Sequence, residues 1–210
     1  MKLCLASRNA GKRREAEEIL GPLGYALLTL EEAGVGSEVE FPEEGDTFEE
    51  NAVSKARALQ ALVGGWCLAD DSGLAVDALG GAPGVRSARY AASMDRAEAR
   101  DRANTQKLLR ELSCVASPHR TARFVCVVAL VGPSDQCLLA RGECLGEIID
   151  APRGHNGFGY DPVFVPAGYT QTMAELSSDE KNRISHRGQA LRALARELRR
   201  RKIMASDAGE

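Results

Sequence analysis

The chain has no apolar run long enough to cross a bilayer or to form the hydrophobic part of a signal peptide. Its longest apolar stretches, such as residues 124–131, are far shorter than the roughly 20 residues that a membrane helix needs. Residues 1–6 are followed at once by the charged residues Arg8, Lys12 and Arg13, a pattern typical of a strand and a turn rather than of a targeting segment. We therefore expect a cytoplasmic protein.

The sequence also lacks an excess of basic charge and any C-x-x-C pair. Its 27 Lys and Arg residues are outnumbered by 30 Asp and Glu residues, which gives a formal net charge of −3. Proteins of duplex nucleic acid usually carry a basic surface, so this class is disfavoured, and we interpret the basic run at 199–202 as a helix end that complements its own dipole. Without zinc-site spacing, the six cysteines are expected to be free thiols.

Helical periodicity at both ends of the chain and extended apolar runs in its middle predict a mixed α/β domain. The pair Thr47 and Glu50 has capping-box spacing at the start of the second expected helix. We expect the acidic pair at 70–71 to interrupt a strand, the glycine-rich stretch 154–166 to lack regular structure, and Ser185 to cap the last helix. The expected strands are 2–6, 66–69, 74–77, 121–131 and 136–149; the expected helices are 10–20, 46–63, 95–112 and 185–203. One domain would cover 1–204, followed by a disordered tail at 205–210.

A polar turn follows the first expected strand and begins the first expected helix. The free amides and positive dipole end of such a helix start suit the binding of phosphate. The Walker A spacing is absent, so the alternative that Asn9 only caps the helix and Lys12 is solvated stays open. The segment consists of Ser7, Arg8, Asn9, Ala10, Gly11 and Lys12.

Five carboxylates form a candidate acidic set. Magnesium prefers carboxylate oxygens together with substrate phosphates, so acids beside a basic phosphate site indicate a metal site. Because successive side chains of an extended segment point to opposite sides, at most one of Asp70 and Asp71 should face a metal. Two adjacent aspartates are also a common turn signal, which is the alternative. The set is Glu43, Glu44, Glu50, Asp70 and Asp71.

Two later segments could bind a base. Residues 157–162 have glycines around aromatic residues, so a ligand could approach the backbone and stack on Phe158 or Tyr160. Residues 181–188 place several hydrogen-bond donors around a helix start. The alternatives are core packing for the aromatic residues and ordinary solvated side chains at a helix N-terminus for the donors.

Taken together and in this order, these segments resemble the inosine triphosphate pyrophosphatase family, also called dITP/XTP pyrophosphatases. The likeness covers nearly the whole chain and differs at Arg8, where many relatives have glycine. The matching motifs are S-x-N-x-x-K-x-x-E from Ser7, E-x-G-x-T-F-x-E-N-A-x-x-K-A from Glu43, A-D-D-S-G-L from Ala69, G-G-A-P-G-V-x-S-A-R-Y from Gly80, G-F-G-Y-D-P from Gly157 and K-N-x-x-S-H-R-G-Q-A from Lys181.

The resemblance implies an elongated, two-lobed α/β fold around a long, mixed, twisted sheet with flanking helices, and an active site in the cleft between the lobes. It also implies a homodimer and a requirement for Mg²⁺. Asp71 would be the proton acceptor and a metal ligand, and Glu43 a second metal ligand unless the adjacent Glu44 takes its place. The phosphate contacts would come from Ser7, Arg8, Asn9, Ala10, Gly11, Lys12 and Lys55, Ser72 would touch the substrate, and the base side would be formed by Phe158, Gly159, Tyr160, Asp161, Lys181, His186 and Arg187.

The implied reaction is hydrolysis of ITP, dITP and XTP to the monophosphate and pyrophosphate, which cleans the nucleotide pool. Hydrogen-bond polarity supports this choice of base, because Lys181 and Arg187 carry donors and no acceptors. Such a pocket accepts the carbonyls of hypoxanthine and xanthine, whereas each amine of adenine or guanine would face a donor at a cost of about 1–3 kcal/mol. We therefore predict that ITP, dITP and XTP are hydrolysed well ahead of ATP and GTP.

Three other functions are weighed against this one. A pyrophosphatase of modified pyrimidines should lack the Ser185-His186-Arg187 element. A non-catalytic nucleotide-binding module would not need an acidic pair beside a lysine. A single-strand nucleic-acid binder that uses Phe158 and the basic run at 199–202 is disfavoured by the net negative charge.

Overall fold

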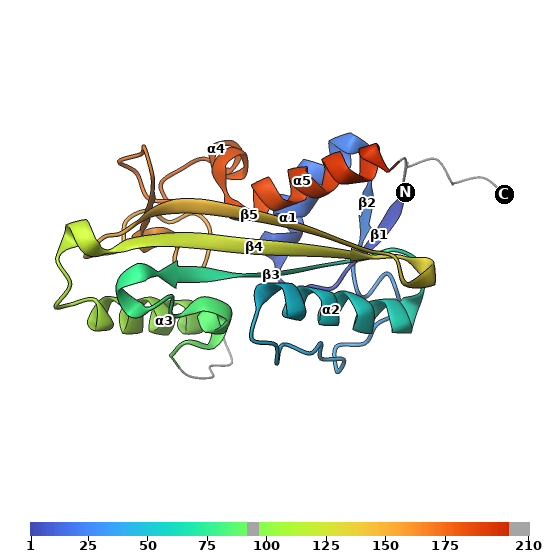
Figure 1. The fold of residues 1–210 in the computed structure, drawn as a ribbon, viewed down its shortest axis with the longest axis horizontal. Coiled ribbons are helices and arrows are strands. Elements are labelled where there is room, and N and C mark those ends of the chain that lie inside the picture. Colours follow the sequence, from blue (N-terminus) through green and yellow to red (C-terminus); the bar gives the residue numbers. More distant parts are fainter. Residues whose placement is uncertain (92–96, 202–210) are drawn as a thin grey trace. The chain divides into compact units, whose positions relative to one another are not determined.

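Helices flank one mixed sheet in the part of the chain that the computed structural model describes, residues 1–91 and 97–201. The strands are β1 (Lys2–Leu5), β2 (Ala26–Leu28), β3 (Cys67–Val76), β4 (Thr121–Val131), β5 (Cys137–Ile148) and β6 (Phe164–Pro166), and the helices are α1 (Ala10–Leu20), α2 (Phe48–Val63), α3 (Ala97–Glu111), α4 (Ser178–Ile184) and α5 (His186–Arg200). Within the described residues the six strands have the order β2-β1-β3-β4-β5-β6 (Figure 1). Strand β1 pairs in parallel with β2 and β3, whereas β6 is antiparallel to β5. The predicted mixed α/β class is confirmed.

The chain folds into two compact units. The first comprises Met1–Asp71, Cys126–Gly142 and the chain from His186 onward, and the second comprises Ser72–Val125 and Glu143–Ser185. Strands β3, β4 and β5 each contribute residues to both units. The candidate site residues are therefore distributed over both units, and each group is described within its own unit.

Two apolar clusters of the first unit cover opposite faces of its strands. Helices α1 and α5 pack against Leu68 of β3 and Val128 of β4, and α2 packs against Ala69 and Val127 on the other face (Figure 1). Successive side chains of a strand alternate between the two faces of a sheet. The same alternation continues into the next two residues of β3 and directs their carboxylates toward different helices.

A separate apolar core stabilises the second unit. Leu108 of α3 packs in this core with Phe124 of β4 and Phe164 of β6. The rings of Phe124 and Phe164 lie 4.6 Å apart between centroids and are tilted, an arrangement worth about 0.5–1.5 kcal/mol beyond the burial of their surface. Tyr160 belongs to the same core, so the segment that contains the predicted base residues is anchored by it.

The helix starts follow the local signals of the sequence. Asn9 accepts a hydrogen bond from the backbone of Lys12 and caps α1, whose bounds match the predicted range 10–20. Thr47 and Glu50 form the predicted capping box at the start of α2. Strand β4 also matches its predicted range 121–131. Capping chemistry and periodicity are local properties, which is why they were readable without the tertiary fold.

Some predicted boundaries were wrong. The acidic pair does not interrupt β3, which runs without a break from Cys67 to Val76. Strands β2 and β6 were not predicted, because three residues are too few for a period of two to be recognised. Helix α4 was also not predicted: Ser177 caps it, but its seven residues carry no apolar stripe. Ser185 directly precedes α5, at the position of the predicted cap, and is at the same time the C-cap residue of α4.

Parts of three predictions lie outside the described part of the chain. These are residues 95 and 96 at the start of the third predicted helix, residues 202–204 at the end of the last predicted helix and of the predicted domain, and the predicted tail at 205–210. Among the residues that are described, none of the helices combines the length and the apolar character required to span a membrane.

Candidate active site

The turn between β1 and α1 places a helix N-terminus directly after a buried strand. The side-chain oxygen of Asn9 accepts a hydrogen bond from the backbone of Lys12 at 3.0 Å, and the Ser7 hydroxyl oxygen accepts one from the backbone of Asn9 at 3.2 Å. Ala10 and Gly11 are the first residues of the helix. The first amides of a helix carry partial positive charge, so this turn has the local chemistry of an anion site.

Arg8 contacts a neighbouring loop in this structure. Its guanidinium donates to the carbonyl oxygens of Gly36 at 2.6 Å and Val39 at 2.8 Å. These residues lie in the segment that leads to Glu43, and Val39 itself packs against the apolar cluster beneath α2. Arg8 thus connects the turn after β1 to the acidic segment, and its predicted phosphate contact stays a prediction.

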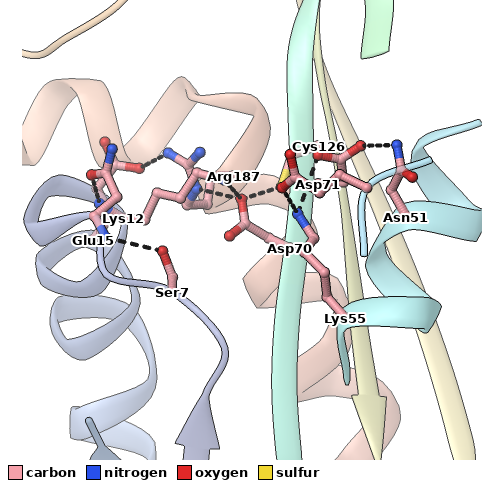
Figure 2. Close-up of polar contacts among 11 residues, drawn as sticks. Ser7, Lys12, Glu15, Asn51, Lys55, Asp70, Asp71, Cys126 and Arg187 are labelled. Atoms are coloured by element: carbon pink, nitrogen blue, oxygen red, sulfur yellow. Dashed lines mark hydrogen bonds and ion pairs between the residues drawn. The ribbon is translucent and has the colours of Figure 1, made fainter. Parts of the chain in front are cut away.

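Asp70 lies on the face of the sheet that α1 and α5 cover (Figure 2). One of its oxygens, Oδ2, is 3.0 Å from Nζ of Lys12 and 3.2 Å from Nε of Arg187. Arg187 in turn donates from Nη1 to Oε2 of the buried Glu15 at 2.6 Å. Burial opposes ionisation of Asp70, but the charges of Lys12 and Arg187 outweigh it and hold the pKa of this carboxyl well below its ordinary value.

Asp71 lies on the opposite face, against α2 (Figure 2). Its Oδ2 accepts a hydrogen bond from the Asn51 side chain at 3.0 Å, and its Oδ1 is 3.3 Å from Nζ of Lys55. The same ammonium is 2.7 Å from Oε1 of Glu43, whereas Glu44 is exposed to solvent. As the alternation of side chains along a strand predicted, the two adjacent aspartates contact different residues on opposite faces of the sheet.

Burial and charge act differently on Asp71 and Lys55. Burial raises the pKa of the Asp71 carboxyl above its ordinary value, although Lys55 and the Asn51 hydrogen bond act against this shift. Burial opposes the charge on Lys55, but the nearby carboxylates of Asp71, Asp70 and Glu43 outweigh it and raise the pKa of the ammonium. Lys55 therefore stays positively charged, and Asp71 is the more readily protonated of the two aspartates.

Glu43 and Asp71 together suit a hard divalent cation. Both carboxylates contact the ammonium of Lys55, so their oxygens lie close enough together to bind one cation. Among the described residues, His, Cys, Asp and Glu side chains form no group of three or more that could hold a metal ion. A cation here would thus need further oxygen ligands, which is the usual situation of magnesium bound by one or two carboxylates and substrate phosphates.

The predicted base residues of the second unit form a compact polar cluster. Oδ2 of the buried Asp161 accepts hydrogen bonds from the Phe158 backbone at 2.9 Å and from Nζ of Lys181 at 2.9 Å. The Lys181 ammonium also lies 4.8 Å from the centroid of the Phe158 ring. Gly157 has a φ of +77°, and a Cβ there would lie only 2.1 Å from Oδ2 of Asp161, so glycine is required at this position.

Helix α3 supports the same loop. Asp101 accepts a hydrogen bond from the backbone of Gly159 at 2.8 Å, and the Thr105 hydroxyl donates to the Gly159 carbonyl at 3.4 Å. The hydroxyl of the buried Tyr160 donates to the carbonyl oxygen of Ser87 at 3.0 Å. Phe158 is half-buried, whereas Tyr160 is 4% exposed and belongs to the core. Of the two aromatic residues, Phe158 is the one placed to contact a ligand.

The structure brings the predicted residues together as two groups. The first unit holds the turn at 7–12, Glu43, Lys55 and Asp71, and also His186 and Arg187, which begin α5. The second unit holds Ser72, residues 158–161 and Lys181. Arg187 was predicted on the base side, but its guanidinium contacts Asp70 and Glu15, because α5 packs on the same face as α1.

Two residues of the first group had no predicted role in it: Glu15 and Asn51. Asp70 belonged to the candidate acidic set, but its partners were not predicted. A signal existed for the other two. Glu15 follows Lys12 by three positions on α1, and Asn51 precedes Lys55 by four on α2, so each pair shares one helix face. The contacts themselves depend on which strand that face meets.

Comparison with known proteins identifies relatives over nearly the whole chain. The sequence profile of the Ham1 family matches residues 3–197. The chain is 47% identical over 194 residues to the dITP/XTP pyrophosphatase of Bacillus subtilis (strain 168), which covers 92% of this chain and 95% of that protein. Among solved structures, a HAM1 protein from Coxiella burnetii is 42% identical with a TM-score of 0.83, covering 95% of this chain and 99% of that one. A nucleoside-triphosphatase, or dITP/XTP pyrophosphatase, from Mycobacterium abscessus is 46% identical with a TM-score of 0.73, covering 92% and 98%.

Proposed function

The chain belongs to the Ham1 family, and we propose that it hydrolyses dITP, XTP and ITP to the nucleoside monophosphate and pyrophosphate. This activity would remove non-standard purines from the cytoplasmic nucleotide pool. One observation carries the proposal: Asp71 and Glu43 converge on Lys55, while the adjacent Asp70 contacts Lys12 at the start of α1. Carboxylates beside two lysines and a helix N-terminus form a site that can hold a polyphosphate together with its counter-cation.

The lysines act on the charge that moves during the reaction. Cleavage between the α- and β-phosphates leaves negative charge on the departing pyrophosphate. Lys12 and Lys55, held in place by Asp70 and Asp71, are the groups we assign to stabilise this charge. The amides of Ala10 and Gly11, the first residues of α1, would bind the same oxygens. Fixed charges need no reorganisation when the bond breaks, so their effect is larger than that of mobile solvent.

Asp71 is the residue we assign to accept the proton of the attacking water. Its raised pKa brings the carboxyl nearer to the range in which a general base works at neutral pH. The Asn51 amide and the Lys55 ammonium hold one oxygen each, so the carboxylate has a fixed direction. Ser72, the next residue of β3, is assigned to contact the substrate.

Magnesium fits the donor set of Glu43 and Asp71, two oxygen ligands that need substrate oxygens to complete a coordination shell. When bound, it would offset charge on the triphosphate. Glu43 is preferred to Glu44 as the second ligand, because Glu43 is the one that reaches Lys55.

The choice of base would be made by Lys181 in the second unit. Asp161 holds its ammonium beside the ring of Phe158, so a cationic donor group lies next to a stacking surface. The ammonium can donate to the carbonyl oxygen at position 6 of hypoxanthine or xanthine, whereas it offers no acceptor to the amine of adenine. A mismatch that buries an unpaired polar group costs about 1–3 kcal/mol, which corresponds to a preference of roughly tenfold to a hundredfold.

The experiment is a panel of triphosphates with purified protein, in which pyrophosphate and free phosphate are quantified separately. We expect dITP, ITP and XTP to give pyrophosphate with Mg²⁺ and none with EDTA, and ATP and GTP to react much more slowly. Release of free phosphate, or comparable kcat/KM for ATP and ITP, would contradict the proposal. Nucleotide binding without any hydrolysis would instead identify a non-catalytic module.

We also infer a homodimer with no stable nucleic-acid partner. The homodimer is what the resemblance to the inosine triphosphate pyrophosphatase family implies, and Leu139 and Leu145 of β5, which are 48% and 59% exposed, are the apolar side chains we assign to its interface. The excess of acidic residues disfavours a polyanionic partner. Light scattering after gel filtration should give twice the mass of the chain, and a monomer at micromolar concentration would contradict this inference.

A further inference from the structure

The side chain of Asn51 makes two directed hydrogen bonds at the candidate active site. Its amide nitrogen donates to Oδ2 of Asp71 at 3.0 Å, and its amide oxygen accepts from the backbone of Gly45 at 2.8 Å. The residue lies on α2 and is 1% exposed. A buried amide with both ends paired has one allowed orientation, because the N–H of Gly45 can only face an acceptor.

Gly45 is adapted to this contact. A Cβ at Gly45 would lie 2.9 Å from the Asn51 amide oxygen and 2.8 Å from Cβ of Glu50, so any side chain would push the segment away from α2. Glu43, two residues earlier, reaches Nζ of Lys55, one helical turn after Asn51. The close approach of Gly45 to α2 therefore determines where the Glu43 carboxylate lies.

We propose that Asn51 is a positioning residue of the active site. The nitrogen of its side-chain amide orients the Asp71 carboxylate, and the oxygen of the same amide fixes the position of the segment that carries Glu43. The inference rests on the proposed function, because it assigns Asp71 and Glu43 to the reaction. Two carboxylates that act together must keep a fixed separation, and one rigid planar group bonded to Asp71 and to the backbone of the segment that carries Glu43 provides it. Groups that orient metal ligands in this way typically contribute about tenfold to a hundredfold to metal affinity or activity.

Two substitutions separate the two contacts. Asn51→Asp keeps an acceptor for the N–H of Gly45 but replaces the donor toward Asp71 by a carboxylate oxygen. Asn51→Leu has a similar shape and removes both hydrogen bonds. The matched control is Gln60→Leu, which exchanges the same chemical groups on the same helix, about 13 Å along its axis from Asn51.

The first measurement is steady-state hydrolysis of dITP with saturating Mg²⁺. We expect kcat to fall by about tenfold or more in both Asn51 variants, with KM for dITP changed by less than about threefold, and Gln60→Leu to match the wild type. The second measurement is hydrogen exchange of the Gly45 amide in protein without metal or nucleotide. Exchange should become faster in Asn51→Leu and stay near the wild-type rate in Asn51→Asp.

The outcomes distinguish this inference from the proposed function. If the wild type hydrolyses no triphosphate, the proposed function fails, and the catalytic role of Asn51 fails with it. If the wild type is active and Asn51→Asp keeps its kcat, the role of Asn51 is overturned while the proposed function stands. Unchanged Gly45 exchange in a folded Asn51→Leu variant also overturns it. Should Asn51→Leu fail to fold, Asn51→Asp decides alone, since it preserves the bond to Gly45.

Discussion

Asp70 and Asp71 are adjacent on β3 but contact lysines of different helices: Asp70 Oδ2 lies 3.0 Å from Nζ of Lys12 on α1, and Asp71 Oδ1 lies 3.3 Å from Nζ of Lys55 on α2 (Figure 2). One strand thus carries a carboxylate to each face of the sheet. Asp70 is enclosed by positive charge, whereas Asp71 also has Glu43 nearby. The two aspartates should therefore respond differently to the same substitution.

Asp71→Asn should abolish most of the activity and leave the fold intact. The amide keeps the shape of the carboxylate but cannot accept a proton from water, so we expect turnover of dITP to fall by at least about a hundredfold. Steady-state kinetics of pyrophosphate release measure the effect, and circular dichroism checks the fold. A variant with near wild-type turnover would show that Asp71 is not the proton acceptor.

Asp70→Asn should mainly reduce stability. The substitution removes the carboxylate that Lys12 and the buried Arg187 share; Arg187 keeps Glu15, but the loss of one charged partner of a buried group still costs about 1–3 kcal/mol. Urea unfolding should give a larger loss for Asp70→Asn than for Asp71→Asn, which leaves Lys55 with Glu43. Equal losses in the two variants would mean that Asp70 is not the main counter-charge of Arg187.

Arg8→Gly introduces the residue that many relatives carry and should loosen the segment that leads to Glu43. The guanidinium bonds to Gly36 and Val39 would be lost, so we expect a Glu-specific protease to cut at Glu38 and Glu40 several times faster. KM for dITP should rise by less than about fivefold, a change of about 1 kcal/mol, because neither of the two lost hydrogen bonds contacts the nucleotide. A rise of tenfold or more, with cleavage unchanged, would instead identify Arg8 as a phosphate ligand.

The free energy of unfolding should decrease above pH 9. Burial raises the pKa of Cys67 and Cys126 to about 12 and that of Cys144 to about 11, from an ordinary value of 9.0. A thiol with a raised pKa in the folded state contributes stability that is complete below pH 9 and is lost as the pH rises toward the folded value. Each such thiol should cost about 1 kcal/mol per pH unit in this window.

Urea titrations at pH 8, 9 and 10 measure this loss. The half-buried Tyr90 and the buried Tyr160 start from an ordinary pKa of 10.0, so the first part of the decrease belongs to the thiols. The exposed Cys114 and Cys137 serve as internal comparison, because they should react with a thiol reagent in the folded protein while the four buried cysteines do not. A stability that is constant from pH 8 to 10 would contradict the prediction.

Several features of the site were predictable because they depend on local geometry. The alternation of a strand separated Asp70 from Asp71, and helical spacing placed Asn51 and Lys55 on one face of α2. The caps at Asn9 and Thr47 were predicted from residue type and spacing. Short elements such as β2, β6 and α4 were missed, since they contain too few residues for periodicity to be detected.

The sequence by itself determined the fold class, the family resemblance and the residue types of the candidate site. Only the tertiary structure decided the partners of Arg187, which lies 117 positions from Asp70 and 172 from Glu15. A guanidinium offers the same donors to a purine carbonyl and to a carboxylate, so its chemistry does not select between them. Packing of α1 and α5 on one sheet face makes the selection, because burial of apolar stripes brings distant polar groups together regardless of their order in the chain.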